Sequence, residues 1–180
     1  VPSPVYTGGV LSGKTIKEIS TGDWHSCAIA SDDRAYCWGY GNNGELGNGT
    51  YNQANAPVAV STSGVMSGKN ITQIATGFNH NCALDSDGKI YCWGQNAYGE
   101  LGNNSTTISN VPVATSMNEF GGRRVKQIIA GFFYSCALTT DGSVFCWGTT
   151  ENGRIGTGQT SGYSARRLVA ADNNLLISLM

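Results

Sequence analysis

Short runs of β-prone residues separated by turn residues follow one another along the chain. They occur at Ile16–Ser20, around Cys27–Ala30 and at Ala35–Gly39, and a weaker run follows a proline at Val58–Val60. Such runs, bounded by Gly, Asn and Asp, predict strands joined by tight turns. The sequence lacks the apolar period of ~3.6 residues that marks a long amphipathic helix. The pattern therefore predicts an all-β fold.

The whole series of runs recurs three times, at offsets of 55 and 54 residues. Three sequence blocks define each unit, and each block occurs in three copies. The first block is Gly22–Ile29, Gly77–Leu84 and Gly131–Leu138, and the second is Tyr36–Gly39, Tyr91–Gly94 and Phe145–Gly148. The third is Gly44–Gly47, Gly99–Gly102 and Gly153–Gly156. Four short strands per unit are the layout of a β-propeller blade. We predict one repeat domain over residues 1–180, with repeats at approximately 1–55, 56–110 and 111–164. Residues 165–180 are expected to start a further, truncated blade.

The repeated motifs resemble the regulator of chromosome condensation repeat family. The resemblance rests on Gly-x-x-His-x-x-Ala-Leu, then Asp-Gly, then Tyr-x-Trp-Gly-x-x-x-x-Gly-Glu-Leu-Gly. It covers Gly13 to about Pro112 in two full copies, and a third copy runs from Arg124 to about Gly158. The resemblance implies a closed propeller, usually of about seven blades, whose faces bind protein partners. It also implies the alternative of a guanine-nucleotide exchange factor for a small GTPase.

Three blades would leave two apolar sheet faces open to water, which folded proteins rarely tolerate. We therefore expect ring closure, either with further blades of a parent chain or with other chains. The apolar segment Leu175–Met180 is a candidate for the opening strand of the next blade. The chain begins at Val1 rather than Met. We expect it to be a mature or excised piece of a longer precursor.

Composition and charge weigh against several functions. Only 13% of residues are charged, the formal net charge is −1, and Lys and Arg form no long basic block. Nucleic-acid binding normally needs a basic footprint, so we do not expect it. Apolar runs stay well short of the ~20 residues of a membrane-spanning helix. The sequence holds no phosphate-binding glycine loop and no HExxH or GxSxG motif, so we predict no cofactor, no metal and no catalysis.

Six cysteines occur as pairs ten residues apart: Cys27 and Cys37, Cys82 and Cys92, Cys136 and Cys146. A three-residue hairpin loop ending at Gly88 places Cys82 opposite Cys92, at a non-hydrogen-bonded position where a disulfide fits. The third repeat gives the same register, whereas the first has Arg34 where we expect Gly. Three disulfides predict an extracellular, periplasmic or cell-surface location. The alternative is six buried thiols in a cytosolic protein.

Several polar residues follow the repeat, which favours structural roles. His25 and His80 share one position, where the third copy has Tyr134, and we expect each ring to fix a local turn. Glu45 and Glu100 share another position, where Arg154 stands in the third copy. A pair of carboxylates is the machinery of a glycosidase, but a position that changes to Arg favours structural or surface roles. Asp at the hairpin tips is expected to form turns.

Functional residues are expected where the copies differ. The loops at one end of each unit carry aromatic and amide side chains, which make good contact surfaces. We predict these contact residues: Trp24, Tyr40, Phe78, Tyr98 and Phe133. The competing interpretation is that these rings wedge between blades. The sequence favours a non-catalytic module that binds a protein, or a glycan, in a secreted or cell-surface protein. The alternatives are an exchange factor and a propeller enzyme, either a lyase or a hydrolase.

Overall fold

The computed structural model describes residues 1–156 and 158, together with the backbone of residues 163–170. Twelve strands form three antiparallel sheets of four strands each. The first sheet contains β1 (Ile16–Thr21), β2 (His25–Ala30), β3 (Ala35–Gly39) and β4 (Ala54–Ala59). The second contains β5 (Ile71–Thr76), β6 (His80–Asp85), β7 (Ile90–Gly94) and β8 (Ser109–Ala114). The third contains β9 (Val125–Ala130), β10 (Tyr134–Thr139), β11 (Val144–Thr149) and β12 (Tyr163–Ala170).

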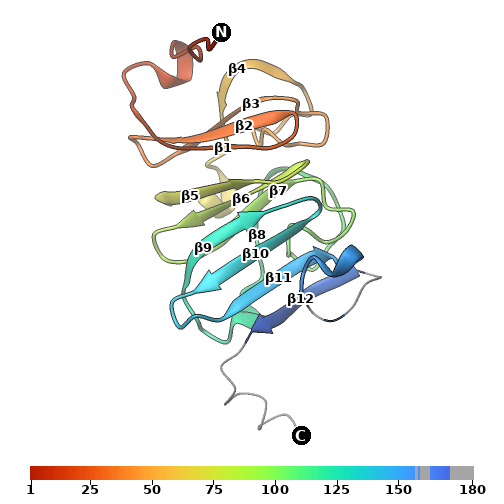
Figure 1. Ribbon diagram of the computed structural model, residues 1–180. Helices are drawn as coiled ribbons and strands as arrows, with labels where there is room; N and C mark the ends of the chain where they lie inside the picture. Colours follow the sequence, from red (N-terminus) through yellow and green to blue (C-terminus); the bar gives the residue numbers. More distant parts are fainter. Residues whose placement is uncertain (157, 159–162, 171–180) are drawn as a thin grey trace, which may run out of the picture.

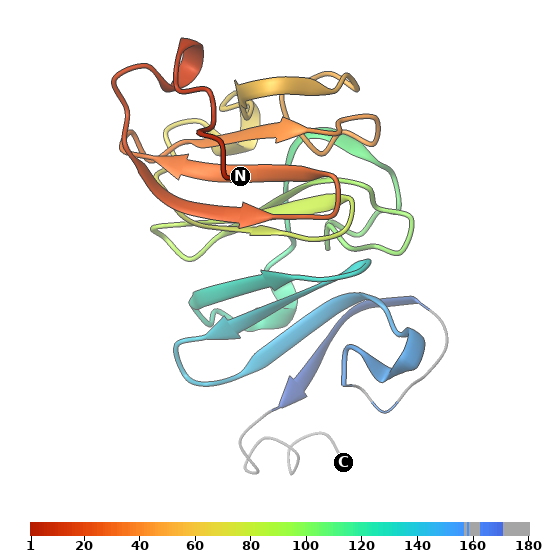
Figure 2. The ribbon, with the colours of Figure 1, turned by 45° about the horizontal axis from the view of Figure 1, so that its top comes forward.

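The three sheets follow one another in a stack from the N-terminal to the C-terminal end (Figures 1 and 2). Within each sheet the strands pair in sequence order and run antiparallel. Short turns join the first three strands, whereas long loops, residues 40–53 and 95–108, lead to β4 and β8. The first strands of successive sheets contact each other, β1 with β5 and β5 with β9. Three short 3-10 turns, η1 (Gly9–Leu11), η2 (Gly64–Met66) and η3 (Asn118–Phe120), each precede the first strand of a sheet, and η4 (Glu151–Gly153) follows β11. The predicted architecture of three four-stranded propeller blades is confirmed.

The fourth strand of each sheet differs from the sequence expectation. β4 and β8 begin before the proline rather than after it, and Pro57 and Pro112 lie inside them. Proline lacks an N–H donor and is tolerated in a strand at the edge of a sheet, which is where both strands lie. Residues 165–170 do not start a new blade, because β12 pairs with β11 and completes the third sheet. Residues 171–180, including the segment Leu175–Met180, lie outside the described residues.

The hydrophobic core lies between the sheets. We call the surface of a sheet that carries its cysteines the front face, and the opposite surface the back face. The front face of the first sheet, with Cys27 and Ile29, packs on the back face of the second, with Ile74 and Trp93. The front face of the second sheet packs in the same way on the back face of the third. A buried residue of a 3-10 turn belongs to each of these two core clusters, Met66 of η2 to the first and Phe120 of η3 to the second.

The second and third strands of every sheet form a hairpin that brings its two cysteines face to face. The register pairs Cys27 with Cys37, Cys82 with Cys92 and Cys136 with Cys146. All three pairs are disulfides with Cα atoms 4.1 Å apart, as the hairpin register predicted. The expectation for the first hairpin was wrong in one detail. Asp33, not Arg34, occupies the left-handed position with φ = 58°, a conformation that Asp tolerates better than most residues.

Candidate functional site

Successive sheets are joined by a hydrogen-bond network centred on one backbone carbonyl. The carbonyl oxygen of Glu45, in the loop after β3, accepts hydrogen bonds from Trp93 Nε1 at 2.8 Å and Asn81 Nδ2 at 2.7 Å. The carbonyl of Glu100 repeats this with Trp147 Nε1 at 2.7 Å and Ser135 Oγ at 3.0 Å. The indoles expected in the core are therefore also polar anchors. Gly47 is required beside the first anchor, because a Cβ there would lie 2.7 Å from Trp93 Nε1.

The histidines extend this network between sheets rather than fixing a local turn, which corrects the expectation for them. His25 Nε2 donates to Asn81 Oδ1 at 2.8 Å. Since Ser135 Oγ donates to the Glu100 carbonyl, it accepts from His80 Nε2, which lies 2.8 Å away. Burial lowers the pKa of His25 and lowers that of His80 to about 3. Both rings are neutral at physiological pH, with the proton on Nε2, and they bridge neighbouring sheets.

The two repeated glutamates are buried and structural, so a surface role is excluded for both. Glu45 Oε2 and Oε1 accept hydrogen bonds from Asn43 N and Asn43 Nδ2 at 2.9 and 2.8 Å. Glu100 Oε2 accepts from Tyr98 N at 2.7 Å, and burial raises the pKa of this carboxyl group. Each carboxylate thus closes the loop that presents its own carbonyl to the next sheet. In the third copy, Arg154 closes the corresponding loop by donating to the Glu151 carbonyl.

The aspartates at the hairpin tips form turns, as expected from their position. Asp85 Oδ1 accepts from Asp87 N and Lys89 N, and Asp141 Oδ1 accepts from Ser143 N. Hydrogen bonds from Thr139 and Ser143 lower the pKa of Asp141 to about 2. Across the described residues, His, Cys, Asp and Glu form no group of three or more that could hold a metal ion.

A cluster of aromatic rings lies at the loop end of the second and third sheets. Phe78 lies 4.3 Å from Phe132 and 5.3 Å from Phe133 between ring centroids, and Tyr98 stacks on Phe133 at 4.9 Å. The predicted contact residues Phe78, Tyr98 and Phe133 are thus brought together. The rings contact each other across two sheets, yet Phe132 remains 48% exposed. The ring contacts between two sheets agree with the interpretation that the aromatic residues wedge between blades, while their contact with a partner stays a prediction.

The other two predicted contact residues line a neighbouring groove. Trp24, in the turn after β1, is 67% exposed, and Tyr40 follows β3. The two are tied together by the hydrogen bond from Tyr40 N to the Trp24 carbonyl at 2.9 Å. With Asn43 and Asn79 they line a groove of about 430 Å³ between the loops of the first and second sheets. We call this groove and the aromatic cluster together the loop-end surface.

Sequence reasoning missed two residues of the loop-end surface. Phe132 is the most exposed ring of the aromatic cluster, and the guanidinium carbon of Arg154 lies 5.7 Å from its ring centroid. Arg154 also donates to the Phe132 carbonyl at 2.9 Å. The substitution of Arg154 for the repeated glutamate was the signal that could have found this contact. Phe133 has φ = 63°, which is uncommon for a bulky residue and costs of order 1–2 kcal/mol.

The stacked blades, their repeated carbonyl anchors and their loop-end surface define a β-propeller of the tandem-repeat class. The sequence matches the family described as Regulator of chromosome condensation (RCC1) repeat over residues 32–84 and 87–138. A second description of the same repeat matches residues 16–45, 71–100 and 125–154. The chain belongs to this family.

Relatives share the repeat over much longer chains. The chain is 31% identical over 165 residues to the ultraviolet-B receptor UVR8 of Arabidopsis thaliana, covering 90% of this chain and 36% of that one. It is 29% identical over 171 residues to human E3 ubiquitin-protein ligase HERC2, covering 93% of this chain and 4% of that protein. The chain thus spans only a minor part of these relatives, and the ligase activity named for HERC2 is a property of that protein.

Solved structures share the fold. Human WBSCR16 superposes with a TM-score of 0.77 at 27% identity, covering 93% of this chain and 40% of that one. Saccharomyces cerevisiae Prp20p, whose binding to Gsp1p and histones is described, superposes with a TM-score of 0.74 at 20% identity, covering 87% of this chain and 38% of that one. Among the described residues, no helix is long and apolar enough to cross a membrane.

Proposed function

We propose that the chain is a non-catalytic scaffold that binds a protein partner through the loop-end surface. The observation that carries the proposal is the grouping of Trp24, Phe132 and their neighbours on one end of the stacked sheets. Exposed aromatic rings held in fixed positions are the usual anchors of protein interfaces. The positive φ of Phe133 supports the proposal, because local backbone strain concentrates at functional positions.

The chemistry of the surface favours a protein over a glycan. Four of its rings contact one another rather than standing as separate platforms, and the groove beside Trp24 is mostly apolar. Arg154, which covers one edge of Phe132, offers a charge for a carboxylate or a carbonyl of a partner. Exchange-factor activity is not proposed, because a likeness of 20% identity to Prp20p shows the fold alone.

A displayed library of random peptides, selected on the immobilised chain, tests this function. We expect enriched peptides to lose at least ~10-fold in affinity on Trp24→Ala or Phe132→Ala, since buried aromatic anchors dominate binding. Val65→Ala is the matched control, because Val65 is an exposed apolar residue in η2, outside the loop-end surface. Peptides that bind all three variants equally would overturn the assignment of the surface. Retention of defined glycans in a manner that depends on Trp24 would overturn the choice of a protein partner.

We also propose that the protein works in an oxidising compartment, extracellular, periplasmic or at the cell surface. All six cysteines take part in disulfides, and cytosolic thiols are normally kept reduced. Mass spectrometry of acid-quenched protein from its native source should find six alkylated thiols only after reduction. Six thiols that react in the denatured protein without a reductant would place it in a reducing compartment instead.

A further inference from the structure

The groove beside Trp24 has a repeat-related counterpart between the second and third sheets. The described residues that line the groove of about 430 Å³ are Trp24, Tyr40 and Asn43 of the first repeat and Asn79 of the second. The residues one repeat further along the chain are Asn79, Gln95, Tyr98 and Phe133. The chain therefore builds the same position twice, each time between two of its own sheets, with different side chains.

Asn43 and Tyr98 hold equivalent places in the backbone. Asn43 N donates to Glu45 Oε2 at 2.9 Å, and Tyr98 N donates to Glu100 Oε2 at 2.7 Å. The loops that carry them also begin alike. In both repeats the residue after the third strand donates its backbone N–H to a carbonyl in the turn after the first strand, at 2.9 and 2.8 Å. The two side chains therefore start from equivalent positions.

Between the second and third sheets the chain fills this position itself. The ring of Tyr98 stacks on Phe133 with the centroids 4.9 Å apart, and Asn79 Nδ2 donates to Gln95 Oε1 at 3.0 Å. Between the first and second sheets, Asn43 and Asn79 stand in place of the two stacked rings, and the groove is open. The groove is thus the place of an aromatic ring that the chain supplies at one interface and lacks at the other.

The residues of the groove offer a tyrosine side chain both apolar surface and a hydrogen-bond acceptor. Trp24 is 67% exposed and Tyr40 is partly exposed, so their rings are open to stacking. Asn43 and Asn79 each donate through Nδ2 to a neighbouring side chain. Neither Oδ1 atom accepts a hydrogen bond from the described residues. A phenol O–H can donate to such an oxygen, whereas a phenylalanine ring cannot.

The charges around the groove disfavour an anionic ring. The described residues that line it are uncharged. Asp23, which precedes Trp24 in the same turn, is exposed, and among the aspartates of the described chain it alone has no ion pair with Lys or Arg. A phosphorylated tyrosine would bring negative charge beside Asp23 without a cation in the groove to pair with. Charge complementarity therefore favours an unmodified tyrosine.

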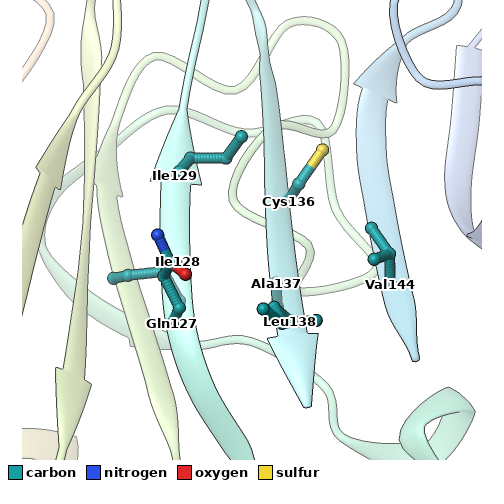
Figure 3. A pocket seen from close by; sticks show the side chains of 7 residues that line it. All are labelled: Gln127, Ile128, Ile129, Cys136, Ala137, Leu138 and Val144. Atoms are coloured by element: carbon teal, nitrogen blue, oxygen red, sulfur yellow. The ribbon is translucent and has the colours of Figure 1, made fainter. Parts of the chain in front are cut away.

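The cavity on the front face of the third sheet is of a different kind. Ile129, Cys136 and Val144 lie there on three adjacent strands and line a space of about 200 Å³ (Figure 3). The side chains labelled in Figure 3 include no aromatic ring, so this cavity offers no ring on which a tyrosine can stack. Of the two, the groove is the site that fits a tyrosine.

We propose that a tyrosine of the protein partner inserts its side chain into the groove, in the place that Tyr98 holds at the next interface. This inference rests on the proposed function, because it names the residue by which the partner binds the loop-end surface. The ring lies against Trp24 and Tyr40, and its hydroxyl group donates to the amide oxygen of Asn43 or Asn79. Tyrosine is enriched among the anchors of protein interfaces because it brings a large apolar surface and a donor at low entropic cost.

Synthetic copies of the peptides selected from the random library are the probe, with affinities measured by calorimetry. Those whose binding depends on Trp24 should contain a tyrosine. Replacing it by alanine should weaken binding at least ~10-fold, because the anchor is lost. Replacing it by phenylalanine should cost ~2–10-fold, the value of one hydrogen bond. Phosphotyrosine in its place should weaken binding at least ~10-fold, because its charge finds no cation in the groove.

Asn43→Tyr is the decisive protein variant, because it fills the groove with the residue that the second repeat carries there. It should fold, since Tyr98 is accommodated at the equivalent position, and urea unfolding checks this. It should weaken binding of the tyrosine peptides at least ~10-fold. Asn118→Tyr is the matched control. Asn118 is exposed in η3, outside the loop-end surface, so this variant should bind as the wild type does.

The outcomes separate this inference from the proposed function. Three results would overturn the tyrosine site and leave the function of the loop-end surface intact. They are peptides that depend on Trp24 or Phe132 but carry no tyrosine, tyrosine peptides that bind Asn43→Tyr as tightly as the wild type, and tighter binding of phosphotyrosine. Peptides that are indifferent to both Trp24→Ala and Phe132→Ala would overturn the function and the tyrosine site together.

Discussion

At the scale of the residue, His80 acts as a buried neutral donor between two sheets. Its Nε2 contacts Ser135 Oγ, and burial holds its pKa near 3, well below the value of about 6.5 for an exposed histidine. His25 makes the equivalent hydrogen bond between the first and second sheets, and burial lowers its pKa as well. In the third copy Tyr134 holds this position, and its hydroxyl group can also act as a hydrogen-bond donor.

This burial predicts a loss of stability in acid. Below a pH of about 6.5 the unfolded chain takes up a proton on His80, which the folded chain cannot do until the pH nears 3. The free energy of unfolding should therefore fall as the pH drops, by up to about 1.4 kcal/mol per pH unit for this residue. His80→Gln, which keeps a neutral amide near the Nε2 position, should flatten that part of the profile. Urea unfolding of the wild type and the variant at pH 7 and pH 5 measures the free energy that each loses between the two pH values. Equal losses in the two proteins would contradict the prediction.

At the scale of the element, the disulfide hairpin is the rigid unit of each sheet. The hairpin of β6 and β7 pairs Cys82 with Cys92, and both cysteines are buried in the core between the second and third sheets. Its loop ends at Gly88, whose φ of 80° suits glycine. The first hairpin reaches the same register with Asp33 in that position. The crosslink and the turn thus specify the same pairing by independent means.

Removing the crosslink should weaken the sheet without changing its register. The double variant Cys82→Ala and Cys92→Ala should lower the free energy of unfolding by about 2–4 kcal/mol, since a closed loop restricts the unfolded chain. Chemical denaturation followed by fluorescence measures this loss. A double variant that unfolds at the same denaturant concentration as the oxidised wild type would show that the disulfide contributes little. Reduction of the wild type, which opens all three bridges, should have a larger effect than the double variant.

At the scale of the whole molecule, stability comes from stacking sheets face to face. The same repeat position is 2% exposed as Ile74 and 59% exposed as Ile19, so the neighbouring sheet alone decides its burial. Ile74→Ala should cost about 2–5 kcal/mol of unfolding free energy, because it leaves a cavity between two sheets. Ile19→Ala should cost less than about 1 kcal/mol, because its side chain is mostly exposed. Thermal and urea unfolding measure both, and equal losses would mean that the inter-sheet contacts do not carry the stability.

The sequence by itself determined the unit of the fold. The repeat of turn residues and β-prone runs gave the first three strands of every sheet, because turns and strand pairing depend on neighbours a few residues away. The spacing of Cys82 and Cys92 about one hairpin gave the disulfides for the same reason. The sequence predicted that the fourth strand starts after Pro57 and Pro112, whereas it starts before them. Pairing at the edge of a sheet accommodates a proline, so the proline is not a boundary of the strand.

Only the tertiary structure decided which residues of different repeats meet. The Glu45 carbonyl accepts a hydrogen bond from Trp93, and Phe78 packs on Phe132, because each sheet is stacked on the next. The pattern of residues along the chain does not show which side chains of two stacked sheets come into contact. Because the sheets are stacked, the histidines bond a neighbouring sheet instead of a local turn. Stacking also buries the repeated glutamates. The order of the sheets in space also decides which repeat positions are covered, so Ile74 is buried while Ile19 is exposed.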